Sequence, residues 1–87
     1  MKIKVKFLND SGAEVVATFD RDAGTVSAQD GRTGTYSRPE GSRVMELKGA
    51  ENITLTFADD IRFETGFSTR YTGSDGRAGL ATILSVE

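Results

Sequence analysis

The chain has no cysteine, no histidine and no tryptophan, and only one proline among its 87 residues. Without cysteine it forms neither a disulfide nor a thiolate metal site, which fits a reducing compartment. Without histidine it lacks the side chain that most often serves acid–base catalysis and metal binding near neutral pH. These absences argue against an enzyme, and we expect no catalytic residue, no cofactor and no metal site.

Motifs for nucleotide and nucleophile chemistry are also missing: there is no phosphate loop, no dinucleotide-binding glycine pattern and no nucleophilic-serine motif. One stretch, Asp20-x-Asp22-x-Gly24, resembles the start of a calcium loop. An EF-hand needs a bidentate glutamate at the twelfth position, where this chain has Gly31, so we interpret the stretch as a turn. An enzyme working through carboxylates alone would need two acids about 5–9 Å apart in a cleft.

Charge gives a second set of exclusions. Eleven basic and thirteen acidic residues leave a net charge of −2, which argues against nonspecific binding to nucleic acid or to an anionic membrane. Lys2, Lys4 and Lys6 form a basic stripe, but no aromatic residues alternate with them for base stacking, so we interpret them as protection of an edge strand. The first residues alternate and do not form a signal peptide's apolar run, which favours the cytoplasm; a removed signal peptide would leave the periplasm open.

What the chain does contain is a period of two. Apolar and polar residues alternate in about eight or nine short segments, separated by Gly, Asp, Asn and Ser turns at a spacing near ten residues. This rhythm predicts one all-β domain over residues 1–87: a small antiparallel up-and-down β-barrel, or a compact sandwich, of about eight short strands. The expected core comprises Ile3, Val5, Phe7, Val15, Ala17, Phe19, Val26, Leu47, Ile53, Leu55, Phe57, Ile61, Phe63, Leu80 and Leu84.

Several local expectations follow from the same pattern. Residues 44–48 form a strand or a short helix, and residues 61–65 form a strand after a tight reversal at Asp59-Asp60. The segment 80–86, apolar on both faces, is expected to be the most buried strand. Phe67 and Tyr71 belong to the core unless Gly66 shifts the register and turns them outward. In a barrel this small, side chains fill the interior and leave little room for a ligand.

One pattern occurs twice: Asp30-Gly31-Arg32-Thr33-Gly34 and Asp75-Gly76-Arg77-Ala78-Gly79. Asp-Gly is a strong hairpin signal, and at Asp30-Gly31 it predicts a type I′ turn. Two similar turns explain the repetition, but the pattern also places arginines, which are favoured at binding hot spots, on rim loops. The residues expected to contact a partner are Arg32, Arg43, Arg70, Tyr71, Asp75 and Arg77.

In strand order and turn placement, residues 7–64 resemble the small β-barrel inhibitors of c-type lysozyme (the membrane-bound and periplasmic lysozyme inhibitor family). The resemblance is carried by residues 15–20, 23–26, 30–33 and 53–57, with Gly41-Ser42 between them. It implies a β-barrel that blocks a lysozyme. The family's two inhibitory loop motifs and its cysteines are not matched, so no inhibitory residue is carried over.

Small size, a rigid scaffold and Arg/Asp-rich turns lead us to expect a non-catalytic protein-binding module, an inhibitor that blocks another protein through its rim loops. Two kinds of target are expected. The resemblance implies a lysozyme-type enzyme, and the other possible target is an intracellular machine, as for small inhibitors encoded by mobile elements. We expect a monomer or weak homodimer with no nucleic-acid or membrane partner. The alternative is a small-ligand or carbohydrate-binding barrel, which an apolar cavity with convergent polar groups would support.

Overall fold

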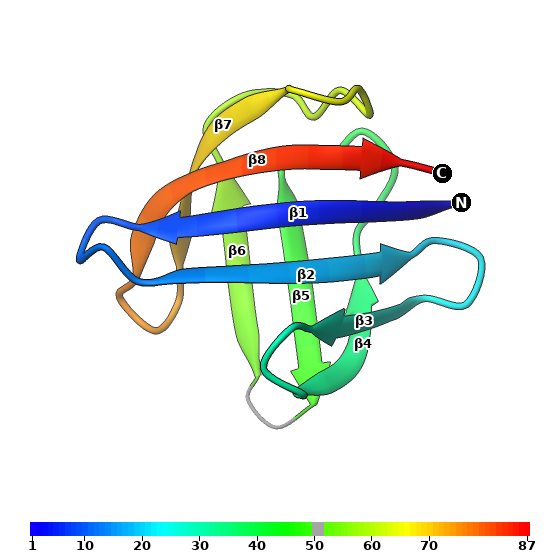
Figure 1. Ribbon diagram of the computed structural model, residues 1–87, viewed down its shortest axis with the longest axis horizontal. Coiled ribbons are helices and arrows are strands. Elements are labelled where there is room, and N and C mark those ends of the chain that lie inside the picture. The colour runs from blue at the N-terminus through cyan, green and yellow to red at the C-terminus, as the bar shows by residue number, and fades with distance from the viewer. Residues whose placement is uncertain (50–51) are drawn as a thin grey trace.

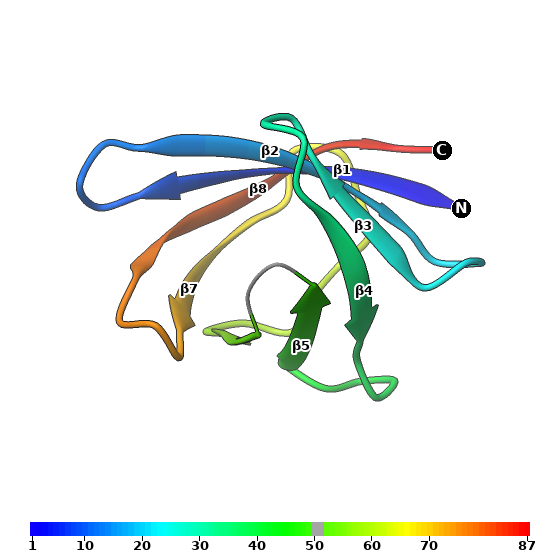
Figure 2. The same cartoon turned by 90° about the horizontal axis from the view of Figure 1, so that it is seen from below.

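The computed structural model describes residues 1–49 and 52–87, and in this part of the chain the architecture is one closed β-barrel (Figures 1 and 2). Every strand is antiparallel to the next, and the last strand closes the barrel by pairing with the first. The predicted all-β up-and-down barrel is confirmed. The eight strands are β1 (Lys2–Asn9), β2 (Glu14–Asp20), β3 (Thr25–Ala28), β4 (Thr33–Ser37), β5 (Val44–Gly49), β6 (Ile53–Phe57), β7 (Ser68–Gly73) and β8 (Ala78–Val86).

The alternation in β1 and β2 determines which side chains face the interior. Ile3 lies opposite Phe19 and Phe7 opposite Val15, all on the inner face, and the lysines of β1 point outward. Because β1 pairs with both β2 and β8, it has no free edge. The interpretation of the lysine stripe as edge protection is therefore wrong; the lysines simply lie on the solvated wall of the barrel.

Aromatic rings occupy the middle of the barrel. The Phe7 ring makes edge-to-face contacts with Phe19 and Tyr71, at centroid distances of 6.2 and 5.3 Å, and Phe19 makes another with Tyr36 at 5.2 Å. Such pairs add about 0.5–1.5 kcal/mol each beyond the area that they bury. Tyr71 is only 6% exposed, which confirms the expectation that it belongs to the core.

Strand β8 faces the interior with different residues from those expected. Leu80 and Leu84 are 37% and 38% exposed, and Ala81 and Ile83 are buried in their place. The sequence of this segment does not decide which face points inward, because both faces are apolar. The neighbours decide it: Ala81 lies opposite Phe7 of β1, and Gly79 lies opposite Tyr71 of β7 and close against the Leu8 carbonyl of β1.

Residues 61–65 do not form the predicted strand, and Asp59-Asp60 does not reverse the chain. Strand β6 pairs directly with β7, so the intervening residues have no neighbouring strand to join. They form a loop over residues 58–67 that is fixed at its far end by Gly66, whose N–H donates to the Ile83 carbonyl at 2.8 Å. Gly66 has φ +92°, a conformation that favours glycine.

The stretch from 44 to 49 is strand β5, so the helical alternative is wrong; Met45 and Leu47 alternate inward as a strand requires. Most of the expected core is buried or half-buried. The expectation of a filled interior is wrong, however. The aromatic layer fills the middle, while each end of the barrel is hollow and opens to solvent through a mouth.

Candidate functional site

The two ends of the barrel differ in what surrounds them. The hairpin end carries the β1–β2, β3–β4 and β7–β8 turns (Figure 1). The termini end carries both chain ends, the β2–β3 and β4–β5 turns and the 58–67 loop.

The repeated Asp-Gly-Arg pattern builds two turns of the same geometry at the hairpin end. In each, the glycine N–H donates to the carbonyl three residues before it at 3.0 Å, and the arginine N–H donates to the aspartate Oδ1 at 3.1 and 3.0 Å. Gly31 and Gly76 have φ of +96° and +88°, and no non-glycine residue of the described chain has positive φ. The predicted type I′ turn is therefore wrong: each is a three-residue loop closed by a glycine bulge.

Within each turn the aspartate also contacts the arginine side chain. Arg32 Nε donates to Asp30 Oδ2 at 2.8 Å, and Arg77 Nε lies 3.4 Å from Asp75 Oδ2. The backbone N–H of Arg32, helped by its guanidinium, holds the pKa of Asp30 below its ordinary value of 3.8. Both contacts use Nε, and within the described chain the terminal guanidinium nitrogens of Arg32 and Arg77 form no hydrogen bond.

The two turns are far apart in sequence and lie at one mouth. Arg32, Asp75 and Arg77 line a cavity of about 170 Å³ together with Lys48, and the Phe7 and Tyr71 rings form part of its wall. Arg32 and Arg77 also line a wider depression of about 520 Å³ beside the β1–β2 turn. The structure thus brings four of the six predicted contact residues, Arg32, Tyr71, Asp75 and Arg77, to one cavity, with cationic side chains around an apolar opening.

The other two predicted residues, Arg43 and Arg70, lie elsewhere. Arg70 is on the outer wall, with Nη2 2.7 Å from Asp10 Oδ2, and Arg43 donates to the Ala58 carbonyl at 3.0 Å. Tyr71 points into the core, and burial raises the pKa of its hydroxyl. Tyr71 lines the hairpin-end cavity but is only 6% exposed, so it offers a partner on the rim little surface, and its role as a contact residue stays a prediction.

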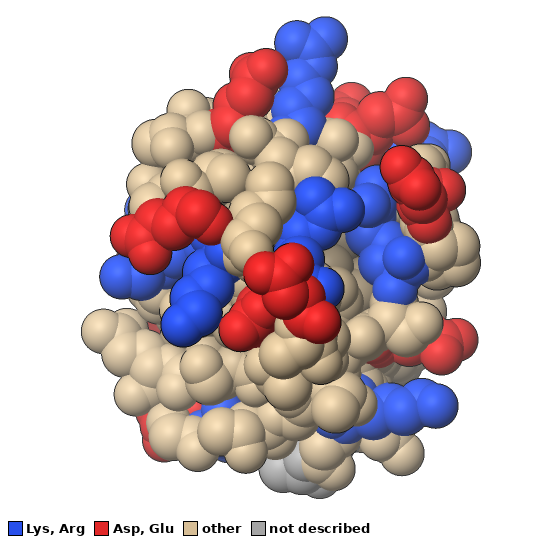
Figure 3. All heavy atoms as spheres, turned by 90° about the vertical axis from the view of Figure 1, so that its right-hand side faces the viewer, with Lys and Arg blue, Asp and Glu red and all other residues tan. Residues whose placement is uncertain are grey.

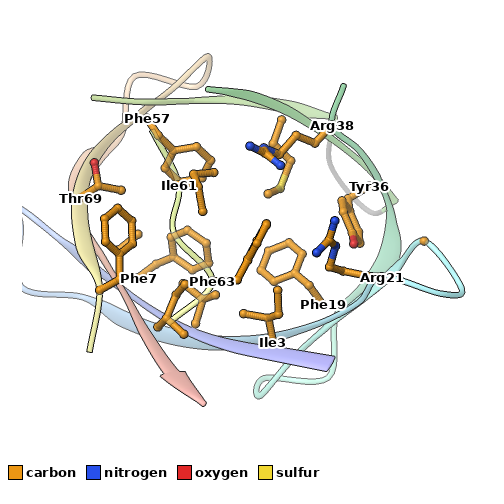
Figure 4. A pocket seen from close by; sticks show the side chains of 16 residues that line it. Ile3, Phe7, Phe19, Arg21, Tyr36, Arg38, Phe57, Ile61, Phe63 and Thr69 are labelled. Atoms are coloured by element: carbon orange, nitrogen blue, oxygen red, sulfur yellow. The ribbon is translucent and has the colours of Figure 1, made fainter. Parts of the chain in front are cut away.

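The termini end holds another cavity, of about 290 Å³, which the sequence did not predict. Its depth is apolar, with Ile3, Phe57, Ala81 and Ile83 among the lining side chains, and its mouth is edged by Arg21, Tyr36, Arg38 and Phe63 (Figure 4). Arg21 lies two residues after inward-facing Phe19, and Arg38 two residues after inward-facing Tyr36. That spacing of two was the signal in the sequence, since alternate residues share a face.

At this mouth the arginines lie against an aromatic ring. The guanidinium carbon of Arg21 is 4.4 Å from the centroid of the Phe63 ring, and that of Arg38 is 5.6 Å away, within range of a cation–π contact. Arg38 Nε also donates to the Ser42 carbonyl at 2.7 Å. Burial raises the pKa of the Tyr36 hydroxyl, so that it is a neutral donor at physiological pH.

No group of three or more acidic, histidine or cysteine side chains converges on a point where a metal could bind within residues 1–49 and 52–87. No described helix is long and apolar enough to cross a membrane. The candidate functional features among the described residues are the two mouths, one with arginines on paired turns and one leading to an apolar cavity. Comparisons with family models, with curated proteins and with solved structures find no match, so these mouths carry the functional argument.

Proposed function

We propose that the protein is a non-catalytic protein-binding module, an inhibitor that blocks another protein through the rim of its hairpin end. One observation carries the proposal: Arg32 and Arg77, 45 positions apart, reach the same mouth from two turns of identical hydrogen bonding. Arg32 Nε donates to Asp30, and Arg77 Nε lies 3.4 Å from Asp75, each aspartate being two residues before its arginine. This arrangement reduces the side-chain entropy that binding would otherwise remove.

The chemistry of the mouth indicates what it contacts on the partner. A guanidinium held through Nε still presents its terminal nitrogens, which bind carboxylates with strong charge-assisted hydrogen bonds. A partner that covers the apolar opening between the arginines would displace water from it, and such surroundings strengthen a contact of this kind. The partner surface that fits is therefore a pair of acidic side chains on a projecting or cleft-lining segment.

Two classes of target meet this requirement. A c-type lysozyme, the target implied by resemblance, works through a pair of carboxylates in an open cleft. An intracellular machine with an acidic recognition surface is the other. An assay in which a c-type lysozyme lyses bacterial cell walls tests the first class of target, because the protein should slow this lysis. Copurification of a partner from a cell lysate tests the second class, the intracellular machine.

The decisive variant is Arg32→Glu/Arg77→Glu, compared with Lys4→Glu/Arg62→Glu, which makes the same change in net charge at exposed positions away from the hairpin end. We expect a stoichiometric partner, or inhibition of the lysozyme, that is lost in the first variant and kept in the second. Circular dichroism verifies that both variants fold. The proposal is refuted if the unaltered protein binds no partner stoichiometrically and inhibits no lysozyme, or if both variants bind equally well.

A further inference from the structure

The termini-end cavity combines an apolar interior with a cationic mouth. Apart from the Thr69 hydroxyl, the deeper lining consists of aliphatic and aromatic side chains. Figure 4 shows the guanidinium groups of Arg21 and Arg38 on the side of the cavity that Tyr36 also borders, with the Phe63 ring between them and the hydrocarbon walls. Pockets that orient a small molecule are built in this way, with a largely apolar surface and a few polar groups at one place.

Neither guanidinium at this mouth forms an ion pair with an acid of the described chain. Asp20 and Asp22 lie on the same turn as Arg21, but their carboxylates have other donors. Asp20 Oδ1 accepts the backbone N–H groups of Asp22 and Ala23, and Asp22 Oδ2 lies 2.7 Å from the terminal amine. Figure 3, which faces this end, shows basic and acidic groups interspersed over the surface.

The position of Phe63 follows from the loop that replaced the predicted strand. Residues 58–67 carry Ile61, Phe63 and Phe67 over the barrel end, and all three line the cavity. Arg38 is half-buried beside them, so its charge has lost part of its hydration without gaining a carboxylate. An anion at the mouth would compensate for that loss, because charges in partly desolvated surroundings interact more strongly than in water.

We propose that this cavity binds a small amphiphilic carboxylate, with its apolar chain among the barrel side chains and its carboxylate between Arg21 and Arg38. A volume of about 290 Å³ corresponds to roughly ten water molecules at about 30 Å³ each, which suits a ligand of about ten heavy atoms. A straight-chain acid of eight carbons has this size. The Tyr36 hydroxyl, at the same mouth, is a third donor for the carboxylate.

Octanoate and octanamide test the proposal, since they have the same number of heavy atoms and differ in charge. In a titration followed by NMR we expect octanoate to shift the signals of Ala81, Ile83 and Phe63 saturably. Octanamide should bind about tenfold more weakly or worse, because a hydrogen bond between two charged groups is stronger than one to a neutral amide. Saturable shifts confined to the hairpin end, equal affinity for the two compounds, or no saturable shift at all would overturn the proposal.

Two variants locate the charge and the cavity separately. Arg21→Gln/Arg38→Gln should bind both compounds equally weakly, while the matched variant Arg32→Gln/Arg77→Gln at the other end should still prefer octanoate. Ala81→Leu, which fills the cavity and leaves both mouth arginines in place, should bind neither. Retained preference for octanoate in the first variant contradicts the proposal. Because the site is at the opposite end from the protein-binding rim, its failure leaves the proposed function untouched, and the reverse holds too.

Discussion

The clearest test of the barrel is a comparison of two neighbouring residues of β8. Ile83 is 6% exposed and faces the interior, while Leu84 is 38% exposed and faces solvent. Truncating a buried isoleucine to alanine costs about 2–5 kcal/mol. Ile83 lines the termini-end cavity and so lacks neighbours on one side, which places Ile83→Ala near the lower half of that range, at about 2–3 kcal/mol. For Leu84→Ala we expect about 1 kcal/mol or less.

Urea unfolding at 25 °C, followed by circular dichroism, measures both free energies, and a constant slope with denaturant shows that the unfolded state has not changed. In thermal unfolding the same difference appears as a fall of roughly 10–20 °C for Ile83→Ala, since 1 kcal/mol corresponds to about 4–8 °C in a domain of this size. A cost for Leu84→Ala equal to or above that for Ile83→Ala would show that β8 has the opposite face inward. The register of the barrel at β1 and β8 would then be wrong.

Three further predictions concern close packing and titration. Gly79→Ala should destabilise the fold by more than about 2 kcal/mol in the same urea assay, because a Cβ there would overlap the Leu8 carbonyl of the neighbouring strand. A cost near zero would show that the two strands are not in such close contact. Asp30 should titrate by NMR below 3.8, and because its folded-state pKa is lowered, the stability that it contributes is present at neutral pH and lost as the pH falls through that lowered value. The pKa values of Tyr36 and Tyr71 are raised by burial, so the stability that their neutral hydroxyls contribute is present below pH 10 and lost as the pH rises through the raised values. Ultraviolet absorbance measures the ionisation of the two tyrosines. Ionisation of both at or below pH 10 in the folded protein would contradict their placement.

The strict alternation of β1 and β2 made the first hairpin predictable, because only one face of each strand is apolar. The repeated Asp-Gly-Arg pattern made two turns predictable and placed Arg32 and Arg77 on rim loops. The sequence could not show that these two arginines reach one mouth. That depends on closure of the barrel, which brings the β3–β4 and β7–β8 turns to the same end.

Two expectations failed for one physical reason. In β8 both faces are apolar, and at residues 61–65 a period of two is present without a neighbouring strand to pair with, so local pattern did not decide the outcome in either case. The choice was made by non-local contacts: small residues of β8 lie opposite the rings of Phe7 and Tyr71, and Phe63 of the loop covers the barrel end.

The sequence by itself determined the class of fold, the number of strands to within one, the position of most turns and the absence of the usual catalytic side chains. Only the tertiary structure decided which face of β8 is buried, where the two mouths lie and which cations edge them. The physical reason is the distance along the chain over which each kind of interaction acts. Backbone preference and side-chain alternation act over a few residues, whereas ring packing, cavity volume and the meeting of distant arginines depend on how the closed barrel brings remote strands together.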